Sequence, residues 1–173
     1  MCAELLESNQ PEILTVDGFH RCHYCRDEII RSCPRSGDPV RTVTVLLADD
    51  NPAILHHVRK MLDKTFKILA AFSDGQSVLR EYENLHPNVI ILDIAMGALS
   101  GIEVARQLRD AGCDSKIVFL TVHEDPDFVN AALGAGGSAY VVKSRLNTDL
   151  IPAISAVRHG KLFVSAPIMY EQI

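Results

Sequence analysis

The sequence predicts a three-layer α/β/α domain, in which a doubly wound, five-stranded parallel sheet has helices on both faces. Two observations support this fold class. From residue 42 onward, short runs of apolar residues alternate with segments whose apolar residues recur at helical spacing. The apolar runs are nearly continuous, which is typical of strands that are buried on both faces of a parallel sheet.

The five strands are expected at the apolar runs, which are rich in the branched and aromatic residues that favour strands. In order these runs are TVTVLLAD at 42–49, FKILAAF at 66–72, NVIILD at 88–93, SKIVFLT at 115–121 and SAYVVK at 138–143. Five helices are expected to follow them, at AILHHVRKMLDK (53–64), SVLREYENL (77–85), GIEVARQLRDAG (101–112), PDFVNAALGAGG (126–137) and TDLIPAISAVRHG (148–160). In the first helix, Ile54, Leu55 and Val58 fall on one stripe with Met61 and Leu62.

A change in composition near residue 40 divides the 173-residue chain. Residues 1–41 contain four of the five cysteines, end in the Pro/Gly/Ser-rich segment CPRSGDPV and show no sustained periodicity. We therefore expect an N-terminal tail at 1–41, largely disordered, a folded domain at 42–165 and a short C-terminal tail at 166–173.

Composition excludes several classes of function. The net charge of −5 provides no basic face for nucleic acid, so we expect no direct DNA binding by this chain. No apolar stretch reaches membrane-spanning length, and the N-terminus lacks the features of a signal peptide. A cytoplasmic location without membrane contact is therefore expected, and the odd number of cysteines favours reduced thiols.

Four polar residues stand where apolar runs end: Asp49, Asp93, Thr121 and Lys143. A single strand-end Asp is more often a helix cap, a single Thr a sheet residue and a single Lys solvated, but ligands of open parallel sheets bind beyond the carboxyl ends of the strands. The four are therefore expected to share one crevice. Asp50 adds a third carboxylate, and three acids that repel one another need a cation between them. Such an oxygen-rich set suits Mg²⁺.

At these residues the sequence resembles the receiver domain of two-component response regulators, over about residues 42–165. The resemblance is carried by ADD at 48–50, LDIAMGALSG at 92–101, FLT at 119–121 and AYVVKS at 139–144. It implies a flavodoxin-like fold and a signalling domain rather than an enzyme, apart from slow autodephosphorylation. It also implies a sensor histidine kinase or phosphotransfer protein as phosphoryl donor, and a downstream protein target. Phosphorylation-dependent homodimerisation is a further expectation.

The resemblance also implies roles for individual residues. Asp93 would be the phosphoacceptor, and Thr121 and Lys143 would bind the phosphoryl oxygens. Thr121 and Tyr140 would form the conformational switch. The Mg²⁺ ligands would be Asp49, Asp50, Asp93 and the backbone carbonyl of Ala95, and no organic cofactor is expected.

The segment VRHGKLFVSAPI at 157–168 resembles the end of receivers of the NarL/LuxR type, which normally continue into a helix-turn-helix domain. Because the chain stops at Ile173, we expect that output domain to be absent. Two residues depart from the family pattern, Gly97 where Pro is frequent and Ser144 after Lys143. Ser144 leaves open whether the preceding peptide is cis, because a cis bond before a residue other than Pro costs about 3 kcal/mol.

Three other functions compete with this interpretation. A phosphatase of the haloacid-dehalogenase type needs a second Asp two residues after the nucleophile, and Ala95 stands there. A flavodoxin-like cofactor binder needs a Gly/Ser/Thr-rich phosphate loop after the first strand, where this chain has ADDNP. A phosphorylation-independent receiver-like interaction module remains the alternative.

Two further features suggest additional hypotheses. In HRCHYCRDEIIRSC, Cys22, Cys25 and Cys33 with His20 or His23 could form a tetrahedral zinc site, although only one CxxC motif is present. A reduced segment without metal is the favoured interpretation. His123, just beyond Thr121, could influence how water reaches a phosphoryl group, although an exposed loop histidine is the simpler interpretation.

Overall fold

The computed structural model describes residues 14–16, 19–21 and 42–165, and the chain divides into two units, Met1–Arg41 and Thr42–Ile173. In the first unit, strands β1 (Leu14–Val16) and β2 (Phe19–Arg21) pair antiparallel. No element was predicted here, although the Asp17–Gly18 dipeptide between the two strands favours a hairpin. The disorder expected for the rest of residues 1–41 and the C-terminal tail expected at 166–173 fall outside the described residues.

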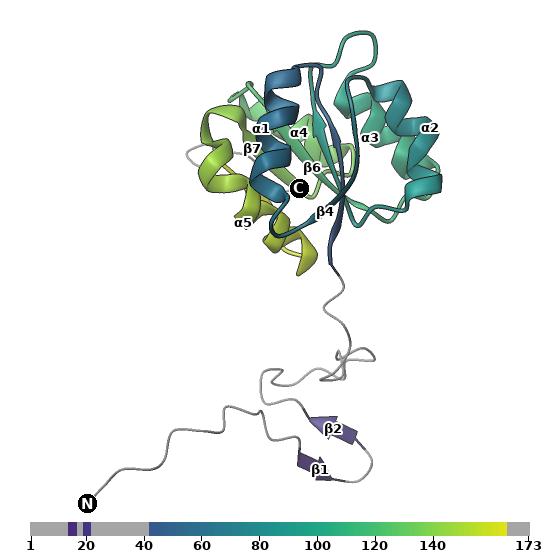
Figure 1. Cartoon of the computed structure of the whole chain (residues 1–173), viewed down its shortest axis with the longest axis vertical. Helices are drawn as coiled ribbons and strands as arrows, with labels where there is room; N and C mark the ends of the chain where they lie inside the picture. Colours follow the sequence, from purple (N-terminus) through teal and green to yellow (C-terminus); the bar gives the residue numbers. More distant parts are fainter. Residues whose placement is uncertain (1–13, 17–18, 22–41, 166–173) are drawn as a thin grey trace, which may run out of the picture. The chain divides into compact units, whose positions relative to one another are not determined.

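The second unit is a six-stranded parallel sheet with strand order β4-β3-β5-β6-β7-β8 (Figure 1). The strands are β3 (Thr44–Ala48), β4 (Lys67–Phe72), β5 (Val89–Asp93), β6 (Lys116–Thr121), β7 (Ala139–Val142) and β8 (Phe163–Val164). The predicted fold class is confirmed. The sixth strand was not predicted, because two residues are too few to show strand periodicity.

Five helices cover the sheet: α1 (Pro52–Leu62), α2 (Gly75–Leu85), α3 (Gly101–Asp110), α4 (Pro126–Gly134) and α5 (Leu146–Arg158). Each of the first four begins at a polar cap whose side chain accepts a backbone N–H of the first turn. These caps are Asn51, Asp74, Ser100 and Asp125. The last helix follows a single 3₁₀ turn, η1 (Lys143–Arg145), and begins two residues earlier than predicted.

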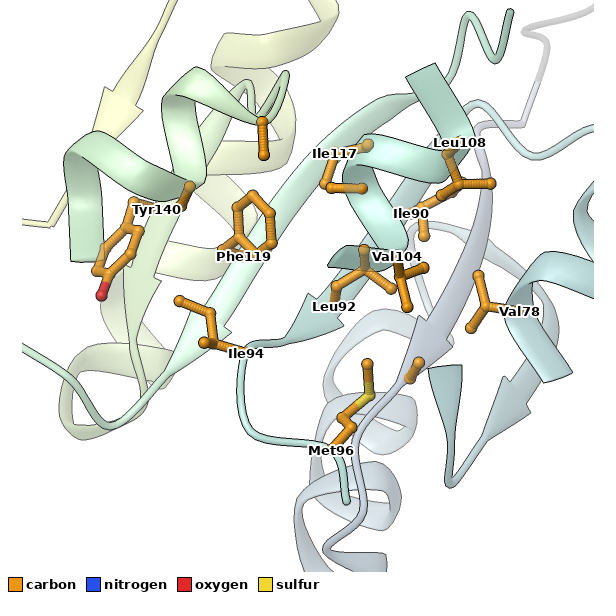
Figure 2. Close-up of a cluster of buried hydrophobic side chains, with 14 of the residues drawn as sticks. Val78, Ile90, Leu92, Ile94, Met96, Val104, Leu108, Ile117, Phe119 and Tyr140 are labelled. Atoms are coloured by element: carbon orange, nitrogen blue, oxygen red, sulfur yellow. The ribbon is translucent and has the colours of Figure 1, made fainter. Parts of the chain in front are cut away.

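The core consists of two layers, one on each face of the sheet. Helices α1 and α5 contribute to one layer, and α2, α3 and α4 contribute to the other (Figure 1). Figure 2 shows part of the second layer, including Val104 and Leu108 of α3, Phe119 of β6 and Tyr140 of β7. Because both faces are covered, the four central strands are almost entirely apolar until they reach their carboxyl ends.

Strand order explains why the carboxyl edge can hold a site. The chain passes from β3 outward to β4 and then returns to β5 on the other side of β3. The connection after β3 and the connection after β5 leave toward opposite faces of the sheet. A crevice therefore remains between them, beyond the carboxyl ends of these two strands. Among the described residues, no helix is long and apolar enough to span a bilayer.

Candidate functional site

The strand-end residues do meet at one edge of the sheet. Asp49 follows β3, Asp93 ends β5, Thr121 ends β6 and Lys143 follows β7. These four strands are consecutive neighbours in the sheet and all are parallel. The structure brings Asp49, Asp93 and Lys143 into contact and places Thr121 on the neighbouring strand, one residue beyond the residue that pairs with Asp93.

Asp49, Asp50 and Asp93 form an acidic cluster in which ligand oxygens, one from each carboxylate, all lie within 4.8 Å of one another. Asp49 and Asp93 are buried, whereas Asp50 is exposed. One oxygen of Asp49, Oδ1, accepts the backbone N–H of Asn51 at 2.9 Å, which fixes the carboxylate at the start of α1. Two acids of the cluster are thus buried, and the third is accessible to solvent.

Lys143 bridges the two buried acids. Its Nζ lies 2.8 Å from Oδ2 of Asp49 and 2.8 Å from Oδ2 of Asp93. Burial of the ammonium lowers the pKa of Lys143, but its hydrogen bonds to Asp49 and Asp93 outweigh this and raise the pKa above the ordinary value. The lysine is therefore held as a cation. Burial also raises the pKa of Asp49, against the lowering effect of Lys143 and the Asn51 N–H.

These oxygens could hold a metal ion. Oδ2 of Asp49 is fully buried, and the Lys143 ammonium lies 2.8 Å from it. The cluster contains three carboxyl groups but only one ammonium group, so the acids outnumber the cation beside them. A hard divalent cation that retains several water molecules suits this set, because the site is open to solvent at exposed Asp50. Ala95 lies exposed in the loop after β5, and the part of its carbonyl in metal binding stays a prediction.

Thr121, Tyr140 and His123 are joined by hydrogen bonds at the end of β6, the strand next to the one that carries Asp93. Thr121 is fully buried, and its Oγ1 accepts the backbone N–H of His123 at 3.2 Å. The ring of Tyr140 is also fully buried, and its hydroxyl donates to the His123 carbonyl at 2.9 Å. The His123 ring, predicted to be an exposed loop side chain, is partly buried and stacks on Phe128 with ring centroids 4.0 Å apart.

Gly101 is a site-forming residue that the sequence analysis did not single out. It begins α3, and a Cβ at this position would lie 2.0 Å from the backbone oxygen of Asp93. Only glycine permits the helix to approach the phosphoacceptor candidate this closely. The local signal that could have located it is the Ser100 cap directly before it, which marks the start of the helix.

The hypothetical zinc ligands Cys22, Cys25, Cys33 and His23 lie outside the described residues, and the alternative ligand His20 belongs to β2. Within the described ranges, the acidic cluster is the group of side chains that could hold a metal.

Comparison with known proteins identifies the family. The family model for the response regulator receiver domain matches residues 45–155. The chain belongs to the response regulator receiver family. This receiver is 31% identical over 126 residues to the nitrate/nitrite response regulator protein homolog of Haemophilus influenzae, which covers 72% of this chain and 61% of that protein. It is 27% identical over 133 residues to the transcriptional regulatory protein DegU of Brevibacillus brevis, covering 76% and 56% respectively. The chain therefore spans little more than half the length of these relatives.

Solved structures agree with this assignment. The receiver is similar to a LuxR-family two-component response regulator from Aurantimonas sp. SI85-9A1, with a TM-score of 0.70 and 28% identity, covering 73% of this chain and 92% of that chain. It is also similar to the isolated REC domain of RcsB from Salmonella enterica serovar Typhimurium in the presence of the phosphomimetic BeF3⁻, with a TM-score of 0.68 and 26% identity, covering 73% and 96%. The predicted resemblance to receivers of the NarL/LuxR type is confirmed.

Proposed function

We propose that this receiver accepts a phosphoryl group on Asp93 in a Mg²⁺-dependent reaction. The observation that carries the proposal is the Lys143 ammonium, which lies 2.8 Å from both Asp49 and Asp93 inside the acidic cluster. The donor would be the phosphohistidine of a sensor histidine kinase or of a phosphotransfer protein. The protein would act in the cytoplasm, where such donors present their phosphohistidine.

In this reaction a carboxylate oxygen of Asp93 attacks the phosphorus of the donor. A new P–O bond forms as the P–N bond of the phosphohistidine breaks, and the imidazole leaves. A bound Mg²⁺ would supply charge neutralisation at the phosphoryl oxygens, held by Asp49, Asp50, Asp93 and the Ala95 carbonyl. Lys143 exchanges its contact with Asp93 for a phosphoryl oxygen, and the Thr121 hydroxyl donates a hydrogen bond to another.

Phosphorylation would alter a partner-binding surface. Thr121 and Tyr140 are linked through the same loop residue, His123, so movement of the Thr121 hydroxyl toward a phosphoryl group disturbs the contacts of Tyr140. The surface formed by α4, β7 and α5 would then differ between the two states, because a few kcal/mol separates alternative packings. A downstream protein, or a second copy of the phosphorylated receiver, would recognise the difference. Direct, specific DNA binding by this chain is not part of the proposal.

A turnover enzyme is not proposed. Ala95 occupies the position two residues after Asp93, where a phosphatase acting through an aspartyl intermediate needs a general acid. Slow hydrolysis of the acyl phosphate by water is compatible with the site. A phosphorylation-independent interaction module is the alternative, and the following experiment separates it from the proposal.

Acetyl phosphate treatment followed by intact-mass measurement tests the proposal. We expect one phosphoryl adduct on the wild-type chain in the presence of Mg²⁺ and none when a chelator is added. Asp93→Asn preserves the shape and removes the nucleophile, so its adduct should be absent. Asp50→Ala should lose most of the transfer while remaining folded, and Asp114→Asn, an exposed acid remote in sequence, is the matched control. An adduct that persists in Asp93→Asn would contradict the proposal, as would the absence of any adduct on the wild-type chain with every donor. The phosphorylation-independent interaction module would then be the better account.

A further inference from the structure

A second polar cluster lies close behind Lys143, formed around the carboxylate of Asp149 in α5. Asp149 is 6% exposed and Ser165, which follows β8, is 1% exposed. The Ser165 hydroxyl donates to Oδ2 of Asp149 at 2.7 Å. Nε of Arg145 donates to the same oxygen at 2.8 Å, and the Thr148 hydroxyl donates to Oδ1 at 2.7 Å. The acidic cluster and the proposed phosphoryl transfer use none of these groups.

The Ser165 hydroxyl has a second contact, which reaches the strand that carries Lys143. It accepts the backbone N–H of Val142 at 3.2 Å. The backbone N–H of Ser165 donates to the carbonyl of Tyr140 at 2.9 Å, which continues the pairing of β8 with β7. The next bond between the two segments is the one from the Val142 N–H to the Ser165 side chain. The single proton of the hydroxyl is used in the hydrogen bond to the Asp149 carboxylate. An oxygen lone pair therefore remains to accept the Val142 N–H.

Residues on both sides of Lys143 in the chain are thereby tied to one buried carboxylate. Val142, immediately before it, is held through Ser165, and Arg145, two residues after it, is held directly. Hydrogen bonds to an ionised carboxylate are short and strong, and each buried group would lose a partner if the hydroxyl were removed. The backbone from which the Lys143 side chain extends is therefore fixed on both sides.

From this geometry we infer that Asp149 and Ser165 are positioning residues for Lys143, which set the place of its ammonium between Asp49 and Asp93. The bland alternative is that they only attach β8 and the start of α5 to the domain. The consequence for phosphoryl transfer rests on the proposed function, whereas the position of the ammonium does not. The test therefore has one arm for each.

The first arm measures the acetylation rate of Lys143 by a small amine reagent, using peptide mass spectrometry of the full chain in Mg²⁺-free buffer. Exposed Lys116 in the same sample is the internal reference. In Ser165→Ala we expect Lys143 to react faster relative to Lys116 by about three- to tenfold, the range that loss of one hydrogen bond corresponds to. Ser165→Thr keeps a hydroxyl and should restore the slow rate.

Val157→Ala is the matched control, because it removes buried methyl groups from α5 without touching the polar cluster. Its Lys143 should react as slowly as in the wild type. Equal labelling of wild type and a folded Ser165→Ala variant would overturn the inference. Equal acceleration in Val157→Ala would overturn it too, since general loosening of α5 would then be the cause.

The second arm measures the initial rate of adduct formation from acetyl phosphate. Ser165→Ala should slow it by a similar factor in the wild-type background and have no further effect in Lys143→Ala. A further loss in the Lys143→Ala background would contradict action through the lysine. If the wild type forms no adduct at all while the labelling results hold, the proposed function fails and the positioning role stands.

Discussion

The hydroxyl of Tyr140 donates a hydrogen bond to the backbone carbonyl of His123 at 2.9 Å, which joins the buried ring of β7 to the loop after Thr121. The same loop residue stacks its ring on Phe128 in the first turn of α4, with the two ring planes 6° apart. Because Thr121 accepts the His123 N–H, one residue connects the phosphoryl-binding candidate, the aromatic switch candidate and α4. A displacement at Thr121 is therefore expected to reach α4 through His123.

Tyr140 should make stability depend on pH in the alkaline range. Burial raises the pKa of Tyr140 to about 12, from an ordinary value of 10.0. Its stabilising effect is therefore complete below pH 10, the unfolded value, and is lost as the pH rises toward 12. We expect the free energy of unfolding of the wild type to fall relative to that of Tyr140→Phe in denaturant titrations between about pH 9 and 11. A difference that stays constant over this range would contradict a buried, neutral tyrosine.

Hydrogen exchange should report the switch. With beryllofluoride as a phosphoryl mimic, we expect altered protection of backbone amides within residues 121–160, which contain the Thr121 loop, α4, β7 and all of α5. The physical reason is that the hydrogen bonds of His123 to Thr121 and Tyr140 must rearrange if the threonine hydroxyl moves. Asp93→Asn is the control and should show no change. Identical exchange in wild type with and without the mimic would contradict the switch.

Substitution of Gly101 tests the close approach of α3 to the site. In Gly101→Ala the new Cβ would meet the Asp93 backbone oxygen at 2.0 Å, so either α3 or the end of β5 must move. We expect a loss of stability in the range of an overpacked core, about 1–3 kcal/mol, together with a lower rate of adduct formation. Gly134→Ala, at a helical position where a Cβ meets nothing within 4 Å, is the matched control and should be neutral or stabilising. Equal effects of the two substitutions would contradict the steric argument.

Much of the fold and site could be predicted because the signals are local. Asp49, Asp93 and Thr121 each end a run of apolar residues, and parallel pairing brings such ends together without any knowledge of the side-chain packing. The strand-end pattern therefore also located Lys143, although its double contact with two carboxylates depends on three-dimensional geometry.

The residues that were missed depend on contacts between distant parts of the chain. Ser165 is one polar residue after a two-residue strand, and its partner Asp149 looks like an ordinary charge in the first turn of a helix. Nothing in the local sequence shows that both are buried and joined. Similarly, the close approach of Gly101 to Asp93 follows from the path of the loop between them, which periodicity does not describe.

Mg²⁺ should stabilise the folded receiver by mass action, because the acidic cluster exists only in the folded state. We expect the melting temperature to rise with Mg²⁺ concentration in the wild type. In Asp50→Ala the rise should be largely lost, since the exposed acid of the cluster is removed while the buried core is untouched. Asp114→Asn removes a negative charge elsewhere on the surface and should respond as the wild type does. An equal rise in Asp50→Ala would show that the effect comes from general screening rather than from this site.

Identifying the phosphorylated residue tests the account most directly. Borohydride reduces an aspartyl phosphate to homoserine, so treatment of the phosphorylated chain followed by peptide mass spectrometry locates the modified residue. We predict homoserine at position 93, formed only when both the phosphoryl donor and Mg²⁺ were present, and no conversion at Asp49 or Asp50. Conversion at either of those acids, or unmodified Asp93 in a chain that carries the phosphoryl adduct, would contradict the claim that Asp93 is the phosphoacceptor.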